Sequence, residues 1–136
     1  MIDQEGFEGW VAFVDATIQQ LFDELGSDVA RRLDFTCESL DVLEEWLLNK
    51  YESVDEILQP SENWYLDRVA KYVGETIRRT VGGEWGIELG NPSYAYYGLP
   101  EIRTSKGETE CPVTLVTASL DRRRGNYIRN IVESMI

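Results

Sequence analysis

The sequence contains no histidine, only two cysteines, and 13 basic side chains against 25 acidic ones. Without histidine the chain has no Ser–His–Asp or Cys–His nucleophile, no imidazole acid or base, and no histidine-ligated metal site. Two cysteines are too few for a zinc quartet, and Cys37 and Cys111 do not suggest a disulfide framework, so we expect two reduced thiols. We therefore expect no metal and no cofactor.

Basic residues and long apolar runs are both scarce. The formal net charge is -12, which argues against direct binding to nucleic acid or to an anionic membrane, because phosphate groups require Lys and Arg. No segment approaches the roughly 20 apolar residues of a membrane span. The N-terminus lacks the basic region of a signal peptide, so we expect a cytoplasmic protein.

The acidic excess lies in one half of the chain. Residues 1–67 contain 17 acidic and three basic side chains, a net charge of -14, whereas residues 68–136 contain eight acidic and ten basic ones. No repeat or linker divides the chain, and 136 residues with 43% hydrophobic content suit one domain, residues 1–136. Such charge asymmetry bears on partners and association rates rather than on the fold.

Apolar residues recur at steps of three and four through the N-terminal half and predict a series of helices. The expected helices cover residues 4–25, a short turn at 28–33, residues 37–51 with Thr36 as the N-cap, residues 53–58, and residues 62–81 with Ser61 as the N-cap. Gly74 lies inside the last of these, where glycine costs about 1 kcal/mol relative to alanine. We expect another element to approach closely at that point.

The period then changes from 3.6 to 2, which indicates strands at residues 84–89, 94–97 and 99–104, followed by a polar loop at 105–110. A helix is favoured for residues 112–120, although the β-branched run at 113–117 leaves a strand as the alternative, and a final helix is expected from Asn126 to Ile136. The predicted class is α+β: N-terminal helices packed on a small antiparallel three-stranded meander with C-terminal helices.

The most distinctive strings are Tyr72-Val73-Gly74-Glu75 and Gly82-Gly83-Glu84-Trp85, followed by a Gly-Leu-Pro-x-Ile strand. Together they resemble a group of small bacterial proteins, some of which accompany polymorphic or contact-dependent toxins as immunity proteins. The resemblance covers roughly residues 64–120 and implies a protein that binds and neutralises a toxin. The same residues also suit packing and turn roles.

Acidic residues follow the outer side of the helix at 37–51 and continue into the next helix. The candidate partner-binding residues are Asp41, Glu44, Glu45, Glu52, Asp55 and Glu56, joined by the tyrosines Tyr94 and Tyr96 of an expected strand. Lys50 is the only base among the acidic ones, so helical ion pairing cannot explain the cluster. A solvated helix face is the alternative. An oppositely charged protein, such as a basic toxin domain, would be attracted to this surface.

Two other functions fit the same composition. The first is a small enzyme that uses carboxylates such as Glu75 or Glu84 near Trp85. The second is an acidic structural protein or a mimic of nucleic acid. The basic run Arg122–Arg124 is expected to complement the end of the preceding helix, with Gly125 as its stop, or to meet the acidic half of the chain.

Overall fold

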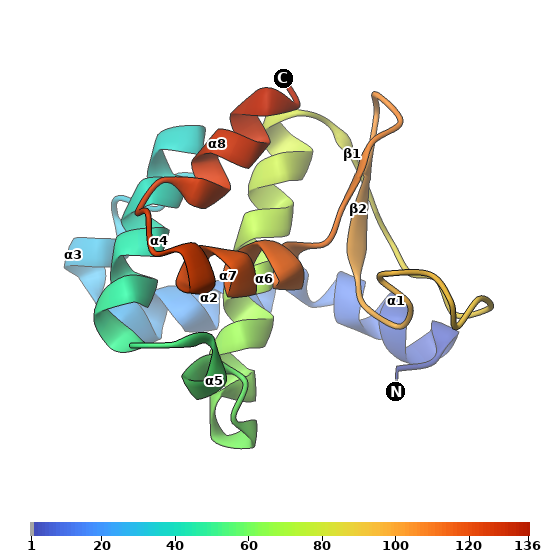
Figure 1. Ribbon diagram of the computed structural model, residues 1–136, viewed down its shortest axis with the longest axis horizontal. Coiled ribbons are helices and arrows are strands. Elements are labelled where there is room, and N and C mark those ends of the chain that lie inside the picture. The colour runs from blue at the N-terminus through green and yellow to red at the C-terminus, as the bar shows by residue number, and fades with distance from the viewer. Residues whose placement is uncertain (1) are drawn as a thin grey trace.

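The computed structural model describes residues 2–136 and has an α+β fold, as the sequence predicts (Figure 1). The N-terminal half contains α1 (Gln4–Ala12), α2 (Val14–Leu25), α3 (Ser27–Ala30), α4 (Cys37–Lys50), α5 (Val54–Ile57), the 3-10 turn η1 (Pro60–Glu62) and α6 (Asn63–Thr80). The C-terminal half contains β1 (Gly83–Gly86), β2 (Glu101–Thr104), β3 (Thr109–Glu110), α7 (Pro112–Arg122) and α8 (Tyr127–Ser134).

Helix α6 runs through the middle of the molecule, with α3, α4 and α8 on one side and the sheet and α1 on the other (Figure 1). Residues 69–77 of α6 are all buried, because α2, α4 and α7 pack around this helix and β1 and β2 lie against it. Most of the apolar core comes from these helices and α8; its fully enclosed members include Leu21, Leu40, Leu47, Ile77, Val116 and Ile128. This arrangement leaves the outer face of α4 at the surface, and on α5 it exposes Asp55 and Glu56 while Ile57 is buried.

The N-terminal helix is broken where the sequence predicts continuity. Phe13 has non-helical angles (φ -103°, ψ 11°) and is 65% exposed, and it separates α1 from α2. The break lets α1 turn toward the sheet, where the ring centroids of Trp10 and Trp85 lie 4.8 Å apart. The following helix keeps Ile18 and Leu21 in the helical core. A single straight helix could not serve both contacts.

The sheet is an antiparallel meander of order β1-β2-β3, but the predicted strand at residues 94–97 is wrong. That segment consists of turns, because the N–H groups of Tyr94, Tyr97 and Leu99 donate to carbonyls three residues earlier. These backbone N–H groups form hydrogen bonds within the turns and therefore do not pair with another strand. The third strand is β3, which lies in the expected loop at 105–110, and β1 ends at Gly86 rather than at residue 89.

The structure also shows the outcome for the predicted helix at 112–120, for the two predicted N-caps and for Gly74 within α6. Residues 112–122 form a helix, which settles the alternative in favour of α7. Thr36 caps α4 by accepting the Ser39 N–H, whereas Ser61 makes no capping bond and α6 is instead entered through η1. Gly74 packs directly beneath the ring of Trp85, so a side chain there would collide with it. The expected close approach is confirmed.

Candidate functional site

The structure divides the predicted acidic face into two parts. Glu45, Glu52, Asp55 and Glu56 are exposed on α4, α5 and the connection between them. Glu44 is buried, and Asp41 is half-buried against α8. The two groups differ in what they can contact, and only the exposed group can form a surface for a partner.

Glu44 is fully enclosed (0% exposed), so its prediction as a partner-binding residue is wrong. Its carboxylate accepts the backbone N–H groups of Tyr127 at 3.2 Å and Ile128 at 3.0 Å. These are the first two residues of α8, where N–H groups have no partner within the helix and the helix dipole favours a negative charge. Glu44 therefore fixes α8 onto α4. Its spacing of four residues from Leu40 and three from Leu47 places it beside the buried stripe, a signal the sequence prediction did not use.

Asp41 belongs to the same contact between α4 and α8. Its Oδ2 lies 3.0 Å from the guanidinium of Arg129, which also contacts Glu133 at 3.2 Å and Glu38 at 3.7 Å. The hydrogen bond to Asp41 is the main cause that raises the pKa of Arg129. Oδ2 of Asp41 is thus paired within the chain, whereas Oδ1 is buried and has no hydrogen-bond partner among the described residues.

The remaining four carboxylates, Glu45, Glu52, Asp55 and Glu56, form what we call the acidic surface. Within residues 2–136 none of them makes an ion pair with Lys or Arg. Glu56 accepts the backbone N–H of Glu52 at 2.9 Å, which leaves its charge uncompensated. The four groups follow one another along the end of α4 and through α5, so their potentials add.

Arg123, which lines a pocket with Glu52 and Asp55, is used by the main chain. The guanidinium of Arg123 donates to the carbonyl oxygens of Leu48 at 3.0 Å, Tyr51 at 3.0 Å and Glu52 at 3.1 Å. It thus satisfies carbonyls at the end of α4, where the helix dipole favours a positive charge. Arg123 of the basic run therefore meets the acidic half of the chain, which was one of the two roles expected from the sequence. Helix α7 ends with Arg123 in the left-handed region (φ 52°), so the expectation that Gly125 stops the helix is wrong.

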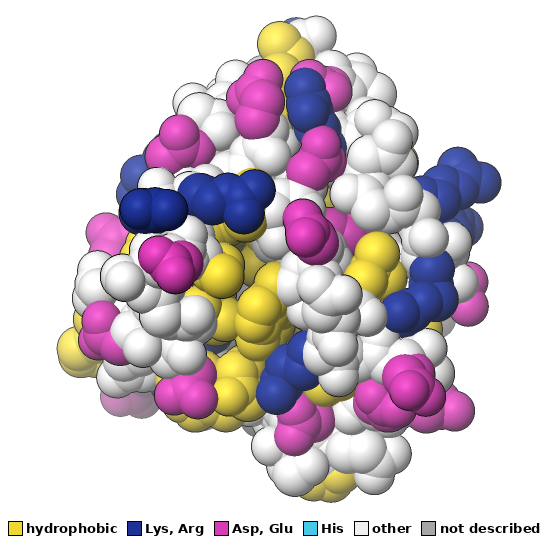
Figure 2. Space-filling model, turned by 90° about the vertical axis from the view of Figure 1, so that its left-hand side faces the viewer, with side chains coloured by type: hydrophobic (Ala, Val, Ile, Leu, Met, Phe, Trp, Pro, Cys, Tyr) yellow, Lys and Arg dark blue, Asp and Glu magenta, His cyan; other side chains and the backbone are white. Residues whose placement is uncertain are grey.

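An aromatic cluster of Trp46, Tyr51 and Tyr65 lies at the same end of α4. Trp46 is 5.7 Å from Tyr65 and 6.5 Å from Tyr51 between ring centroids. A cavity of about 350 Å³ opens here, lined by Glu24, Leu25, Trp46, Asn49, Lys50 and Tyr65. On the face that carries α3 and α4, Figure 2 shows hydrophobic side chains gathered in a hollow framed by charged groups. The three-four spacing of apolar residues in α4 gives no signal of this cavity, because it marks Trp46 only as one more apolar residue of the helix.

The tyrosines Tyr94 and Tyr96 are not part of this region. Their rings meet edge to face at 5.7 Å within the turns that connect β1 to β2. This connection lies beside α1, on the other side of α6 from α4 (Figure 1). The structure therefore brings the exposed carboxylates of α4 and α5 together but places the two tyrosines on a separate surface.

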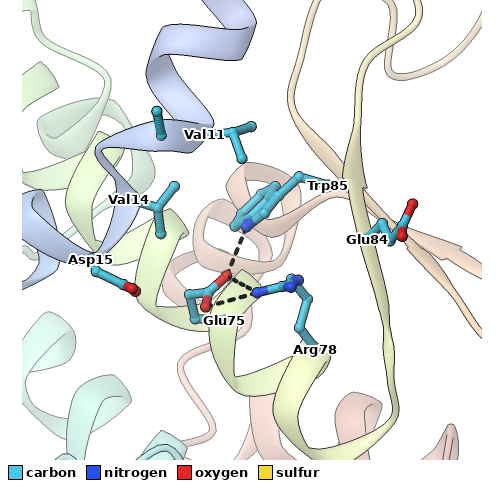
Figure 3. Close-up of a pocket in the computed structure, with 8 residues that line it drawn as sticks. Val11, Val14, Asp15, Glu75, Arg78, Glu84 and Trp85 are labelled. Carbon is cyan, nitrogen blue, oxygen red and sulfur yellow. Dashed lines mark hydrogen bonds and ion pairs between the residues drawn. The ribbon is translucent and has the colours of Figure 1, made fainter.

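Glu75 and Trp85 line a second cavity of about 350 Å³ (Figure 3). Glu75 is buried, and both of its carboxylate oxygens accept from Arg78 at 2.8–2.9 Å, while Oε2 also accepts the indole N–H of Trp85 at 2.8 Å. Glu84 also lines this cavity, but its side chain leaves the opposite side of β1 and points away from Glu75 (Figure 3). The two carboxylates named for acid–base chemistry do not converge on one point.

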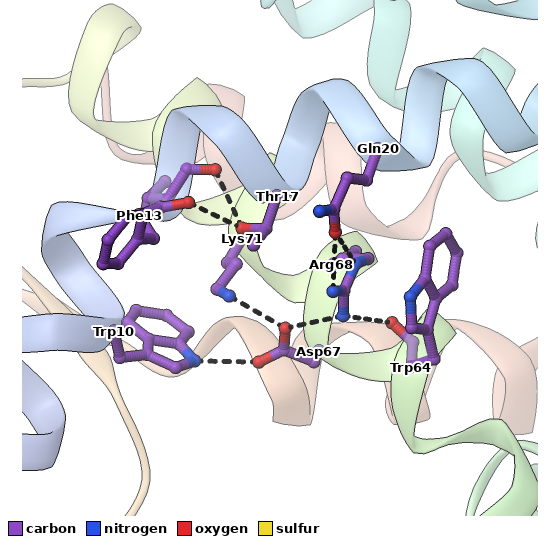
Figure 4. Close-up of polar contacts among 9 residues, drawn as sticks. Trp10, Phe13, Thr17, Gln20, Trp64, Asp67, Arg68 and Lys71 are labelled. Carbon is purple, nitrogen blue, oxygen red and sulfur yellow. Dashed lines mark hydrogen bonds and ion pairs between the residues drawn. The ribbon is translucent and has the colours of Figure 1, made fainter.

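A cluster of polar side chains attaches α1 and α2 to α6 (Figure 4). Asp67 accepts the Trp10 indole N–H at 2.8 Å and the Lys71 ammonium at 2.9 Å. Next to it, Arg68 donates to the side-chain oxygen of Gln20 at 2.8 Å. The polar groups of these side chains are thus hydrogen-bonded within the chain, and their bonds hold α1, α2 and α6 together.

No group of three His, Cys, Asp or Glu side chains in residues 2–136 is placed to hold a metal ion. Nor does any helix of this described part have the length and apolar character needed to cross a membrane. Comparison with protein-family models, with curated proteins and with solved structures finds no match for this chain.

Proposed function

We propose that this chain is a protein-binding protein that neutralises a basic protein partner, most simply a bacterial toxin, by covering it with the acidic surface. The observation that carries the proposal is the set of exposed carboxylates on α4 and α5 that have no ion pair within residues 2–136. Those of α4 that face α8, by contrast, are bound by Arg129 or by backbone N–H groups.

Unpaired like charges on neighbouring helices oppose folding, because they repel one another in the compact state. A partner with a complementary basic surface relieves this repulsion when it binds. It also gains in association rate, since electrostatic steering raises rates from roughly 10⁵–10⁶ to as much as about 10⁸–10⁹ M⁻¹s⁻¹ at low salt. A protein that must inactivate a toxin before the toxin acts benefits from this rate.

The class of partner comes from the resemblance to immunity proteins, and the charge argument is independent of it. Gly74 and Trp85, which carry much of that resemblance, pack against each other between α6 and β1. Binding is favoured over catalysis because the oxygens of Glu75 are already occupied and Glu84 points elsewhere.

The experiment uses the product of the neighbouring gene, or a protein that co-purifies with the chain from its native host. Association rates are measured by stopped flow at several salt concentrations for the wild type and for the triple variant Glu45→Lys, Glu52→Lys, Asp55→Lys. We expect the rate of the variant to fall at least about tenfold at low salt and to lose most of its salt dependence, because the steering term is removed.

A second triple variant provides the matched control. Glu8→Lys, Glu84→Lys, Glu108→Lys makes the same change in net charge at exposed sites on α1, β1 and the turn between β2 and β3. This control is expected to retain most of the wild-type rate. Equal loss in both variants would mean that total charge, and not the acidic surface, controls association. No loss in either would refute the proposed function.

A further inference from the structure

We propose that the aromatic cluster Trp46, Tyr51 and Tyr65 is an anchor site for one arginine or lysine side chain of the basic partner, and that Lys50 occupies this site until the partner displaces it. The inference rests on the proposed function and names the specific contact that the acidic surface would support.

The first observation is that the cluster already holds a cation. The ammonium nitrogen of Lys50 lies 4.4 Å from the ring centroid of Tyr65, 5.5 Å from Tyr51 and 5.9 Å from Trp46. All three distances fall within the range of about 6 Å in which a ring face attracts a cation. Three rings from α4, its C-terminal end and α6 therefore surround one positive charge.

The second observation is that Lys50 has no ion pair within residues 2–136. Its contacts are with ring faces, each worth only about 0.5–1 kcal/mol at an exposed site. Lys50 is itself exposed, at the last position of α4 and on a long flexible side chain. Such an occupant can leave without breaking a hydrogen bond or unfolding a helix.

Carboxylates at the rim favour a cation over a neutral group. The hydroxyl of Tyr65 donates to Glu24 at 3.0 Å, and that of Tyr51 donates to Glu62 at 2.7 Å. These bonds fix the two tyrosines and place negative charge beside their rings. The C-terminal end of α4 adds the negative end of its helix dipole.

Position and shape indicate which cation the site would take. Glu45 precedes Trp46 and Glu52 follows Tyr51 in the chain, so two carboxylates of the acidic surface lie near the anchor site, while Glu24 lines its cavity directly. The cavity of about 350 Å³ is open to solvent along Trp46 and Tyr65, which suits the end of a protein side chain. Arginine fits best, because a planar guanidinium stacks on aromatic faces and is more weakly hydrated than an ammonium.

The test uses the amide of N-acetyl-arginine as a probe and follows the assigned indole N–H signal of Trp46 by NMR. In the wild type the probe is expected to shift this signal in a saturable way, whereas the amide of N-acetyl-glutamine shifts it little. Lys50→Gln removes the internal occupant and should strengthen probe binding by about two- to five-fold, the loss of one exposed cation–π competitor.

Lys106→Gln is the matched control, since it removes the same charge from an exposed turn between β2 and β3. If Lys50→Gln binds the probe no more tightly than Lys106→Gln, then Lys50 is not a displaceable occupant. Both lysines are exposed, so neither variant should disturb the fold. Trp46→Leu removes the indole signal, so its probe binding is followed by the backbone N–H signals of Asn49 and Tyr65, which line the same cavity, and saturable shifts of these signals should be lost. Equal probe shifts at the backbone signals of all Asp and Glu residues would overturn the site.

The two proposals can fail separately. Loss of partner binding on reversing the acidic surface, together with unchanged partner binding in Trp46→Leu, would retain the proposed function and reject the anchor site. Conversely, the probe could bind saturably at Trp46 while the charge-reversed variant still binds its partner normally. That result would retain the anchor site as a cation site and reject the proposed function.

Discussion

Replacing Glu44 by glutamine is expected to destabilise the protein strongly, although the change is nearly isosteric and the residue was predicted to lie on the surface. The native carboxylate accepts two backbone N–H groups of α8 from a fully enclosed position. Glutamine can accept only one of them, because its other terminal group is an NH₂ donor. One N–H of α8 and one amide group would then be buried without partners.

The magnitude follows from these bonds. Hydrogen bonds to a charged group contribute about 1.5–3 kcal/mol each, against about 1 kcal/mol for a neutral one, and an unsatisfied buried donor costs about 1–3 kcal/mol. The negative charge at the start of α8 adds up to about 2 kcal/mol. Removing a buried charge returns part of this sum, because its desolvation penalty disappears. We expect a net loss of about 2–4 kcal/mol in the free energy of unfolding.

Urea denaturation followed by circular dichroism measures this loss. Glu45→Gln provides the control, since it makes the same chemical change at the next residue, which is exposed. The control should shift the free energy of unfolding by less than about 0.5 kcal/mol. If Glu44→Gln and Glu45→Gln unfold at the same urea concentration, with the same dependence of the free energy on urea, then Glu44 does not hold α8 onto α4.

Three further predictions concern the packing of Gly74 on the sheet, the half-buried carboxyl group of Glu110 and the two thiols. Gly74→Ala should lower the free energy of unfolding by about 1–3 kcal/mol, because the added methyl group meets the indole ring of Trp85 in β1. Gly9→Ala, which has open space around it, should raise this free energy by up to about 1 kcal/mol. Urea denaturation midpoints check both, and equal shifts in the two variants would contradict the packing of Gly74 on Trp85. Burial, and after it the neighbouring carboxylate of Glu108, raises the pKa of Glu110 above 4.5. The contribution of Glu110 to the free energy of unfolding is therefore fully present below pH 4.5 and is lost as the pH rises through the pKa of the folded state. Glu110→Gln should therefore stabilise the protein at pH 7 and have no such effect well below 4.5, and a gain independent of pH would exclude this cause. Burial also raises the pKa of the thiols of Cys37 and Cys111, so both should react with DTNB far more slowly in the folded chain than in urea, and a thiol that reacts immediately would be exposed.

Local patterns account for most of the helices. The three-four spacing predicts the helices of the N-terminal half, and Thr36 caps α4 as its side chain allows. Gly74 even indicates a close approach within α6. These features depend on neighbours within a few residues, so they can be recognised without knowing the rest of the fold.

Strand pairing and side-chain partners depend on distant parts of the chain. The tyrosine-rich segment alternates like a strand, yet Tyr94 and Tyr97 form turn hydrogen bonds, and Thr109 pairs with Arg103 instead. Periodicity could not distinguish these outcomes, since both leave the aromatic rings partly buried.

The sequence alone determined that the negative charge lies in the helical half and that α4 and α5 carry more carboxylates than nearby bases could pair. Only the tertiary structure decided which of those carboxylates remain available. Arg129 binds Asp41, and the start of α8 encloses Glu44, although both partners lie more than 80 residues further along the chain. The packing of α8 on α4 encloses Glu44 and pairs the half-buried Asp41 with Arg129, because a carboxylate removed from water needs donors and an exposed one does not.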